Sequence, residues 1–452
     1  MSSADLPRRD FLALAATVVL GGRLPALRGV GRPRPSASQL IWQRDELALF
    51  THFGVNTFTD REWGDGQESP SIFNPSALDA RQWTGAARAA GFKTVILTAK
   101  HHDGFCLWPT ATTTHSVASS PFRGGHGDVV RELADACRVD GLRLGLYLSP
   151  WDRNAAVYGS ERYSDFYCDQ LSELLTRYGP VHEVWFDGAN GEGPSGKRQR
   201  YDWPRYWGLV RRLQPDAVIF SDAGPDVRWI GNERGSAGET NWSTVDPAVV
   251  PFPGSDGPAV ITMLQEGDPA GSVWRPGETD TSIRPGWFYH EAEDHKVRSI
   301  DDLVALYTTS VGRNSKLLLN VPPTRDGLLH QTDVRQLAGM RHALDALFTE
   351  PLAPDQRPIW HRAAKLPTVQ LELGRNTAVS VAVIAEDIRQ GQVIARWRLE
   401  GEGDAGWLPL ARGTTVGFKR IIRFPSTRVR RVRVMIDEAM GSAPPPRLQL
   451  YA

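Results

Sequence analysis

The feature that most constrains the fold of this chain is an alternation of strand-like and helix-like segments, repeated four times from about residue 48. The expected strands are short and rich in apolar or β-branched residues: 48–56, 93–100, 143–148 and 181–186. Between them, apolar residues recur at i, i+3, i+4 and i+7, the spacing of an amphipathic helix, over 79–90, 130–137 and 171–178. Apolar strands that alternate with such helices form a parallel sheet covered by helices.

The length of the repeat, roughly 35–50 residues, favours a (β/α)8 TIM barrel, regular or irregular, over a doubly wound sheet. No GxGxxG motif opens a helix, which weakens the dinucleotide-binding alternative. We expect further strands at 217–220 and 316–321 and a late helix over 333–348. The intervening stretch after Asp222 is loop-rich, and we predict no elements there.

The chain has 452 residues, too many for one ordinary domain. After about residue 354 the helical spacing disappears, and short alternating segments predict a β-sandwich. We expect its strands at 369–373, 378–384, 393–399, 419–424, 429–436 and 448–451. The predicted organisation is therefore a barrel over 39–353 and a sandwich over 354–452.

The first residues resemble a targeting segment rather than part of a domain. Arg8-Arg9 is followed by the apolar run 12–20 and then by Gly21-Gly22, which is typical of a twin-arginine export signal. The run is shorter than the ~20 residues of a membrane-spanning helix, so we expect no stable membrane insertion. We assign 1–38 to the signal and a linker, and expect a periplasmic or secreted protein.

Charge and cysteine usage exclude some functions. Lys plus Arg equals Asp plus Glu, 52 each, so nothing indicates a nucleic-acid partner. The three cysteines, Cys106, Cys137 and Cys168, form no CxxC pair, which argues against a structural zinc site and a disulfide framework. Cys137 falls on the apolar face of an expected helix, so we expect it to be buried.

Polar side chains stand at the expected carboxyl ends of successive strands. His52 ends the first, His101-His102 follow the second, Tyr147 lies near the end of the third, and Asp187 ends the fourth in Val184-Trp185-Phe186-Asp187-Gly188. Taken singly, a histidine is usually structural and an Asp-Gly is common in turns. In a barrel, however, all five would meet at one face, where catalytic groups lie.

A catalytic metal is the alternative use of a histidine cluster with carboxylates. Barrel metallohydrolases show His-x-His on the first strand, whereas this chain has Thr51-His52-Phe53 there and an adjacent pair on the second. Adjacent residues on a strand point to opposite faces, so both histidines can reach one ligand only where the strand ends. We therefore expect a polar organic ligand and no metal or other cofactor.

Several motifs together resemble glycoside hydrolase family 29, the α-L-fucosidases, over roughly residues 40–450. They are Thr51-His52-Phe53-Gly54, Lys100 to Phe105, Trp185-Phe186-Asp187-Gly188, Leu318 to Pro323, Ala385 to Ile388 with Gly391-Gln392, and Gly417 to Arg420. The resemblance implies metal-free hydrolysis of terminal α-L-fucose with retention. It assigns the nucleophile to Asp187 and contacts with fucose hydroxyls to His52, His101, His102 and Tyr147.

Retention requires a second carboxyl group as acid/base. The candidates are Glu233, Glu239, Glu266 and Glu278. The stretch 227–233, ending in Gly231-Asn232-Glu233, resembles the branch that prefers α-1,3/1,4-linked fucose, in which this Glu is the acid/base. Glu278 is the reserve candidate for the acid/base, and we also expect it to contact a neighbouring sugar. The resemblance also suggests that Glu62 contacts the sugar, and Trp287 is expected to pack on its apolar face.

Other functions stay open at this stage. They are a fucosidase with α-1,2 or broad linkage preference, another retaining barrel glycosidase such as an α-galactosidase, a metallohydrolase, and a non-catalytic carbohydrate-binding protein on the same scaffold. The presence of both Asp187 and Glu233 favours an enzyme. We expect its partner to be a fucosylated oligosaccharide or glycoconjugate and expect no nucleic-acid partner. The sequence leaves the oligomeric state open.

Overall fold

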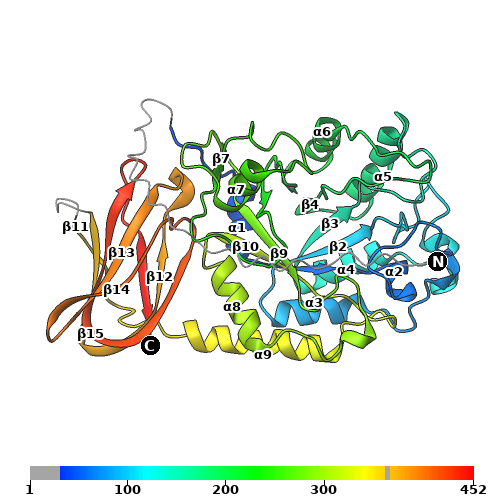
Figure 1. The fold of residues 1–452 in the computed structure, drawn as a ribbon. Coiled ribbons are helices and arrows are strands. Elements are labelled where there is room, and N and C mark those ends of the chain that lie inside the picture. Colours follow the sequence, from blue (N-terminus) through cyan, green and yellow to red (C-terminus); the bar gives the residue numbers. More distant parts are fainter. Residues whose placement is uncertain (1–30, 362–366) are drawn as a thin grey trace, which may run out of the picture.

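Eight parallel strands form a nearly closed barrel, followed by a separate antiparallel sheet, in the computed structural model, which describes residues 31–361 and 367–452 (Figure 1). The order around the barrel is β5 (Val218–Phe220), β4 (Glu183–Trp185), β3 (Arg143–Leu148), β2 (Thr94–Lys100), β1 (Leu47–Thr51), β10 (Ser315–Asn320), β9 (Gly277–Ser282) and β6 (Arg228–Trp229). A parallel bridge between Phe220 and Val227 joins the two ends of this order. The predicted TIM barrel and C-terminal β-sandwich are confirmed.

Helices cover the outside of the barrel. They are α3 (Ala80–Ala89), α4 (Val129–Asp140), α5 (Tyr163–Arg177), α6 (Trp203–Leu213), α7 (Pro258–Glu266), α8 (Ile300–Ser310) and α9 (Gln331–Phe348). The sequence marks α4 at both ends: the Asp128 side chain accepts from Arg131 N at its start, and Gly141 ends it with φ 67°. No helix lies between β5 and β6, so the barrel is irregular at this point.

The first strand is shorter than predicted. We expected it over 48–56, but β1 ends at Thr51, and Val55–Thr59 form the short helix α2. Likewise β4 stops at Trp185, one residue before the predicted end. The early ends place His52 and Asp187 just beyond their strands, on the loops that surround the barrel mouth.

A helix before the first strand, α1 (Ala37–Asp45), covers the opposite end of the barrel. Ser36 caps it in a reciprocal pair with Gln39, so the predicted linker ends two residues earlier than we expected. Trp42 is fully buried, and its Nε1 donates to Glu183 Oε2 at 3.0 Å. The twin-arginine pattern and the apolar run 12–20 lie outside the described residues.

The stretch left unassigned after Asp222 contains regular elements that were not predicted from the sequence. One of them, α8, does show helical spacing, since Leu303, Val304 and Tyr307 lie on its buried side. Besides β6, α7, β9 and α8, the stretch holds an antiparallel pair outside the barrel, β7 (Thr244–Val245) and β8 (Val273–Trp274). Short 3-10 helices occur elsewhere: η1 (Pro70–Ile72), η2 (Val117–Ser119), η3 (Phe122–Gly125), η4 (Glu291–Glu293) and η5 (Ile388–Gln390).

The C-terminal domain is built from long strands. They are β11 (Ile359–His361), β12 (Thr368–Ala385), β13 (Ile394–Gly403), β14 (Gly406–Gly413), β15 (Arg420–Ala439) and β16 (Arg447–Tyr451). The strands predicted at 369–373 and 378–384 form one long strand, β12, and those predicted at 419–424 and 429–436 form another, β15. The pairing of β12 with β15 contains register shifts that correspond to β-bulges or irregularities. The edge strands β11 and β14 were not predicted, because their residues are mostly exposed or half-buried and show no apolar alternation.

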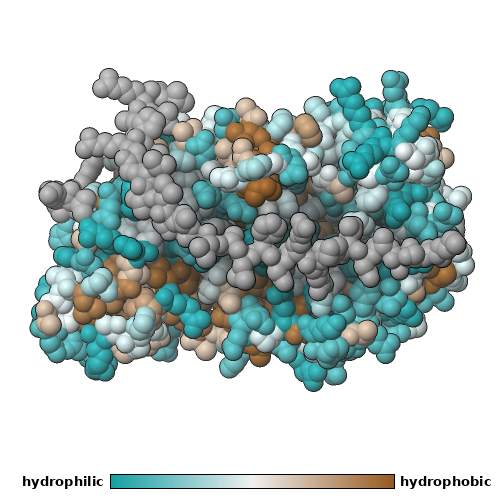
Figure 2. All heavy atoms as spheres, in the orientation of Figure 1, coloured by the Kyte–Doolittle hydropathy of each residue, from teal (hydrophilic) through white to brown (hydrophobic). Residues whose placement is uncertain are grey.

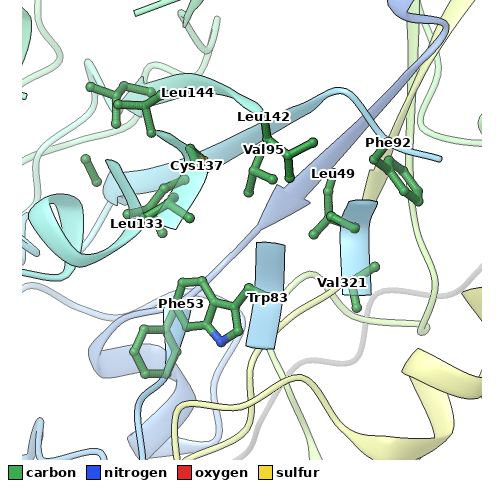
Figure 3. Packing of buried hydrophobic residues seen from close by; sticks show 14 of the residues in the cluster. Leu49, Phe53, Trp83, Phe92, Val95, Leu133, Cys137, Leu142, Leu144 and Val321 are labelled. Carbon is green, nitrogen blue, oxygen red and sulfur yellow. The ribbon is translucent and has the colours of Figure 1, made fainter. Parts of the chain in front are cut away.

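The main core lies between the barrel strands and their covering helices (Figure 3). Leu49 and Val95 from the strands pack in it with Trp83 and Leu133 from α3 and α4. Cys137 lies in the same layer at 2% exposure, as predicted. On the face in Figure 2, hydrophilic residues predominate over the barrel half. Within the described ranges, no helix is both long and apolar enough to cross a membrane.

Candidate active site

A pocket of about 240 Å³ opens at the carboxyl ends of the barrel strands. Eight of the nine predicted site residues line it, the exception being Glu278. The full lining consists of Phe50, His52, Glu62, Trp63, His101, His102, Tyr147, Trp185, Asp187, Ala189, Glu233, Asp280 and Trp287. The convergence expected from strand ends is therefore present in the structure.

Asp187 lies two residues beyond β4 and is partly exposed to the pocket. Its Oδ2 accepts a hydrogen bond of 2.9 Å from the Tyr147 hydroxyl, and its Oδ1 accepts one of 2.7 Å from Ala189 N. Burial, followed by the charge of this carboxylate, raises the pKa of Tyr147 well above its ordinary value. Tyr147 therefore stays a hydroxyl donor, and the carboxylate is held in one orientation.

The three histidines form one buried cluster beside Asp187. The ring centroids of His52 and His101 are 5.5 Å apart, and those of His101 and His102 are 4.0 Å apart. Both His101 and His102 line the pocket because β2 ends at Lys100. Burial lowers the pKa of all three, that of His52 to about 3, so the cluster is neutral near pH 7.

Glu233 lies in the loop after β6, at the rim of the pocket, where solvent reaches its side chain. Loss of hydration and then the nearby charge of Asp187 raise its pKa above 4.5, while a hydrogen bond from Trp287 acts in the opposite direction. A carboxyl group in such surroundings holds its proton more readily than a carboxyl group in water.

Glu62 holds the loop that carries Trp287. Its two oxygens accept from the backbone N–H groups of Trp287 and Phe288, at 2.8 and 3.1 Å. A further contact joins Glu62 Oε1 to His290 Nε2 at 2.8 Å, and His290 Nδ1 lies 2.7 Å from Asp60 Oδ1. Glu62 therefore connects the loop after β1 with the loop after β9, and both loops form walls of the pocket.

The prediction that Glu278 contacts a sugar is wrong. Glu278 is the second residue of β9 and is fully buried, in register with Lys316 inside the barrel. Trp185 Nε1 donates to its Oε1 at 3.0 Å. Burial, followed by the charge of Glu183, raises its pKa well above the ordinary value, although Lys316 opposes this shift. The sequence predicts no regular element around Glu278, whereas residues 277–282 form the strand β9, and the later part of this strand reaches the pocket with Asp280.

The other two acid/base candidates lie elsewhere. Glu239 forms ion pairs with Arg313 and Arg420, and Glu266 is the last residue of α7. Neither lines the pocket, which leaves Glu233 as the candidate that the structure places there.

Sequence reasoning missed Asp280, a fourth carboxyl group in the pocket beside Glu62, Asp187 and Glu233. It is 4% exposed and accepts from Trp229 Nε1 at 2.7 Å. Burial and then the charge of Glu233 raise its pKa well above the ordinary value. All six residues of its strand, Gly277–Ser282, are buried, and five of them are polar, so no apolar run or apolar alternation marks this strand in the sequence. Over residues 31–361 and 367–452, no group of three His, Cys, Asp or Glu side chains is arranged to hold a metal ion.

Known proteins are similar to this chain over most of its length. The α-L-fucosidase family model matches residues 42–346. The chain is 44% identical over 438 residues to α-L-fucosidase 1 of Arabidopsis thaliana, covering 90% of this chain and 85% of that protein.

Solved structures with a similar fold are also known. A glycoside hydrolase 29 family member from an unknown rumen bacterium has a TM-score of 0.87 at 41% identity, covering 93% of this chain and 77% of that one. A Ruminococcus gnavus GH29 fucosidase in complex with fucose has a TM-score of 0.81 at 29% identity, covering 94% and 95%.

Proposed function

Because this chain belongs to the α-L-fucosidase family, glycoside hydrolase family 29, and is a glycoside hydrolase, we propose that it releases terminal α-L-fucose with retention of configuration. In this proposal Asp187 is the nucleophile and Glu233 is the acid/base. The histidine cluster, Tyr147 and Trp287 hold the fucose ring.

The observation that carries the proposal is that two carboxyl groups of one pocket, those of Asp187 and Glu233, lie in different surroundings. Both oxygens of Asp187 accept hydrogen bonds, one from the Tyr147 hydroxyl and one from Ala189 N. The pKa of Glu233 is raised by loss of hydration and by Asp187, which favours a protonated acid. A retaining glycosidase needs this division between an ionised nucleophile and a protonated acid.

The reaction follows from these two states. Asp187 Oδ attacks the anomeric carbon while Glu233 gives its proton to the leaving glycosidic oxygen, so the C–O bond to the aglycone breaks as a fucosyl ester forms. Glu233, now a carboxylate, takes a proton from water. The resulting hydroxide attacks the same carbon, breaks the ester and restores Asp187 and protonated Glu233.

We propose a preference for fucose linked α-1,3 or α-1,4 to GlcNAc, as in Lewis-type glycans. The support is the stretch Val227–Glu233, which resembles the branch with this preference, together with the presence of Glu233 at the pocket rim. A fucosidase with α-1,2 or broad preference is the alternative, and substrate comparison separates the two. Free fucose is measured from Lewis a trisaccharide and from 2′-fucosyllactose. Equal or faster release from the second substrate would contradict the linkage proposal.

The catalytic roles are tested with Asp187→Ala and Glu233→Gln. Asp187→Ala should lower kcat by several orders of magnitude, as loss of a nucleophile does, and azide should restore turnover with formation of fucosyl azide. Glu233→Gln should lose far more activity on an unactivated glycan than on an aryl fucoside with a good leaving group. Glu239→Gln is the matched control and should keep wild-type activity, since Glu239 does not line the pocket. Full activity in Asp187→Ala would refute the assignment.

We also propose export by the twin-arginine route, to the periplasm or beyond, on the support of Arg8-Arg9 and the apolar run that follows. Replacing both arginines with lysine keeps the charge but should leave the full-length protein inside the cell. Cell fractionation measures the effect. Unchanged export of the double variant would contradict this route.

A further inference from the structure

Two pocket histidines have their Nδ1 atoms engaged by neighbouring side chains. His52 Nδ1 lies 2.8 Å from Asn320 Oδ1, and His102 Nδ1 lies 2.8 Å from Ser149 Oγ. A neutral imidazole has one N–H donor and one bare acceptor nitrogen. The proton position at Nδ1 therefore decides whether Nε2 offers the pocket a donor or an acceptor.

At His52 the proton position follows from the orientation of the Asn320 amide. Asn320 Nδ2 lies 2.8 Å from the carbonyl oxygen of Trp287, which can only accept, and Asn320 Oδ1 lies 3.2 Å from the backbone N–H of His52, which can only donate. These two main-chain groups fix which end of the amide is oxygen. Because Oδ1 is an acceptor, His52 Nδ1 carries the proton.

The serine beside His102 gives the same result by a different route. Ser149 Oγ lies 2.6 Å from the carbonyl oxygen of Trp151, so its single proton is donated there. Its oxygen can then only accept from His102 Nδ1. Each of these partners is in turn fixed by backbone, not by a side chain that could rotate away.

Neither histidine carries a second proton near pH 7. Burial lowers the pKa of His52 to about 3 against the raising effect of Asn320. Burial also lowers the pKa of His102, although the charge of Asp187 acts in the opposite direction. His102 Nε2 lies 3.8 Å from Asp187 Oδ2 and, without a proton, donates nothing to it. The Nε2 atoms of both rings are therefore bare.

We propose that Asn320 and Ser149 are positioning residues that fix His52 and His102 as Nδ1–H tautomers, so that both rings accept hydrogen bonds from sugar hydroxyls. The inference rests on the proposed function for the identity of the ligand. Its chemical consequence concerns the transition state. A hydroxyl that donates to a bare nitrogen gains electron density on oxygen, and this density stabilises the positive charge that develops at the anomeric carbon.

The tautomers are tested directly in the free protein by long-range ¹H–¹⁵N NMR of ¹⁵N-histidine-labelled enzyme. His52→Gln and His102→Gln assign the signals. We expect a protonated Nδ1 and a bare Nε2 for both rings. Ser149→Ala should remove this preference at His102, and Ser149→Thr, which keeps a hydroxyl, should retain it. A protonated Nε2 at either ring in the wild type would overturn the proposal.

Asn320 has a matched pair of its own. Asn320→Leu removes the acceptor, whereas Asn320→Asp keeps an oxygen beside Nδ1 and adds a charge. The added charge should raise the pKa of His52 and introduce a new loss of activity on the acid side of the kcat/KM profile. A purely structural role for Asn320 would lower activity in both variants without that new limb.

Kinetics with modified substrates complete the test. Fluorine can accept a hydrogen bond but cannot donate one. At the 3- or the 4-position of an aryl fucoside, replacing the hydroxyl with fluorine should therefore lower the kcat/KM of wild type as much as replacing it with hydrogen. Ser149→Ala should lower kcat/KM about tenfold on the parent fucoside, the effect of losing one net hydrogen bond. If the tautomers are as expected but no fucoside is hydrolysed, the proposed function fails and the tautomer assignment stands. If fucosides are hydrolysed and Ser149→Ala changes neither the tautomer nor kcat/KM, the proposal is wrong.

Discussion

Asp152→Asn should destabilise the barrel strongly, although it changes one atom. Lys100 is fully buried, and its Nζ donates to Asp152 Oδ2 and Gln170 Oε1, both at 2.8 Å. The other Asp152 oxygen accepts from the backbone N–H groups of Asn154 and Ala155, at 3.0 and 2.8 Å. Both sides of the carboxylate therefore face donors.

An asparagine cannot satisfy this arrangement. One side of its amide is an NH2 group, which must face either the ammonium of Lys100 or the two backbone N–H groups. The buried cation also loses its counter-charge. Breaking a buried ion pair by removing one partner costs about 3–5 kcal/mol, a large share of the ~5–15 kcal/mol that stabilises a typical domain.

The assay is equilibrium unfolding in denaturant, followed by tryptophan fluorescence and circular dichroism. Asp152→Asn should lower the free energy of unfolding by about 3–5 kcal/mol. Combined with Lys100→Met, which removes the cation, it should recover part of that loss. The control is Asp165→Asn, which breaks an exposed pair with Arg205 and should cost at most ~1 kcal/mol. A loss below about 1 kcal/mol in Asp152→Asn, or no recovery in the double variant, would refute the reasoning.

Two further predictions concern the pocket loops and the barrel base. Burial opposes the charge of His290, but hydrogen bonds to Asp60 and Glu62 outweigh it and raise its pKa above 6.5. The stabilisation that protonated His290 gives is fully present below pH 6.5 and is lost as the pH rises through the raised pKa of the folded state. The difference in free energy of unfolding between wild type and His290→Gln, measured in denaturant titrations, should therefore shrink as the pH rises above 6.5. Trp42→Ala should cost about 3–5 kcal/mol, because it empties a fully buried site and removes the donor to Glu183; thermal unfolding checks this, and a loss under ~1 kcal/mol would contradict it.

The residues at the ends of apolar strands could be predicted from sequence, because burial on both faces leaves a continuous apolar run. The polar residues that follow such a run mark the barrel mouth. His52, His102 and Asp187 are of this kind. Asp280 could not be found in the same way. Its strand, Gly277–Ser282, carries polar side chains inside the barrel, so it has neither an apolar run nor a clear end.

The same reason explains the error at Glu278. A glutamate after Arg275-Pro276-Gly277 has the composition of a loop, and only the pairing of β9 with β10 shows that it points into the barrel. There Glu278 accepts a hydrogen bond from Trp185 and lies near the charge of Lys316, and both residues are distant from it in sequence. Local patterns carry no information about such partners, whereas they predict helix ends well, as at Gly141.

The helix at the base of the barrel has a consequence for the order of folding. Trp42 of α1 contacts Glu183 and lies 4.9 Å from Lys316 Nζ, and β1 pairs with β10 from Leu47 opposite Leu317. The first elements of the barrel thus form their native contacts only after its last strand, some 270 residues further along the chain, has been synthesised. Until residue 320 has emerged, any sheet that the nascent chain forms lacks this last pairing and keeps an unpaired edge, a surface that promotes aggregation.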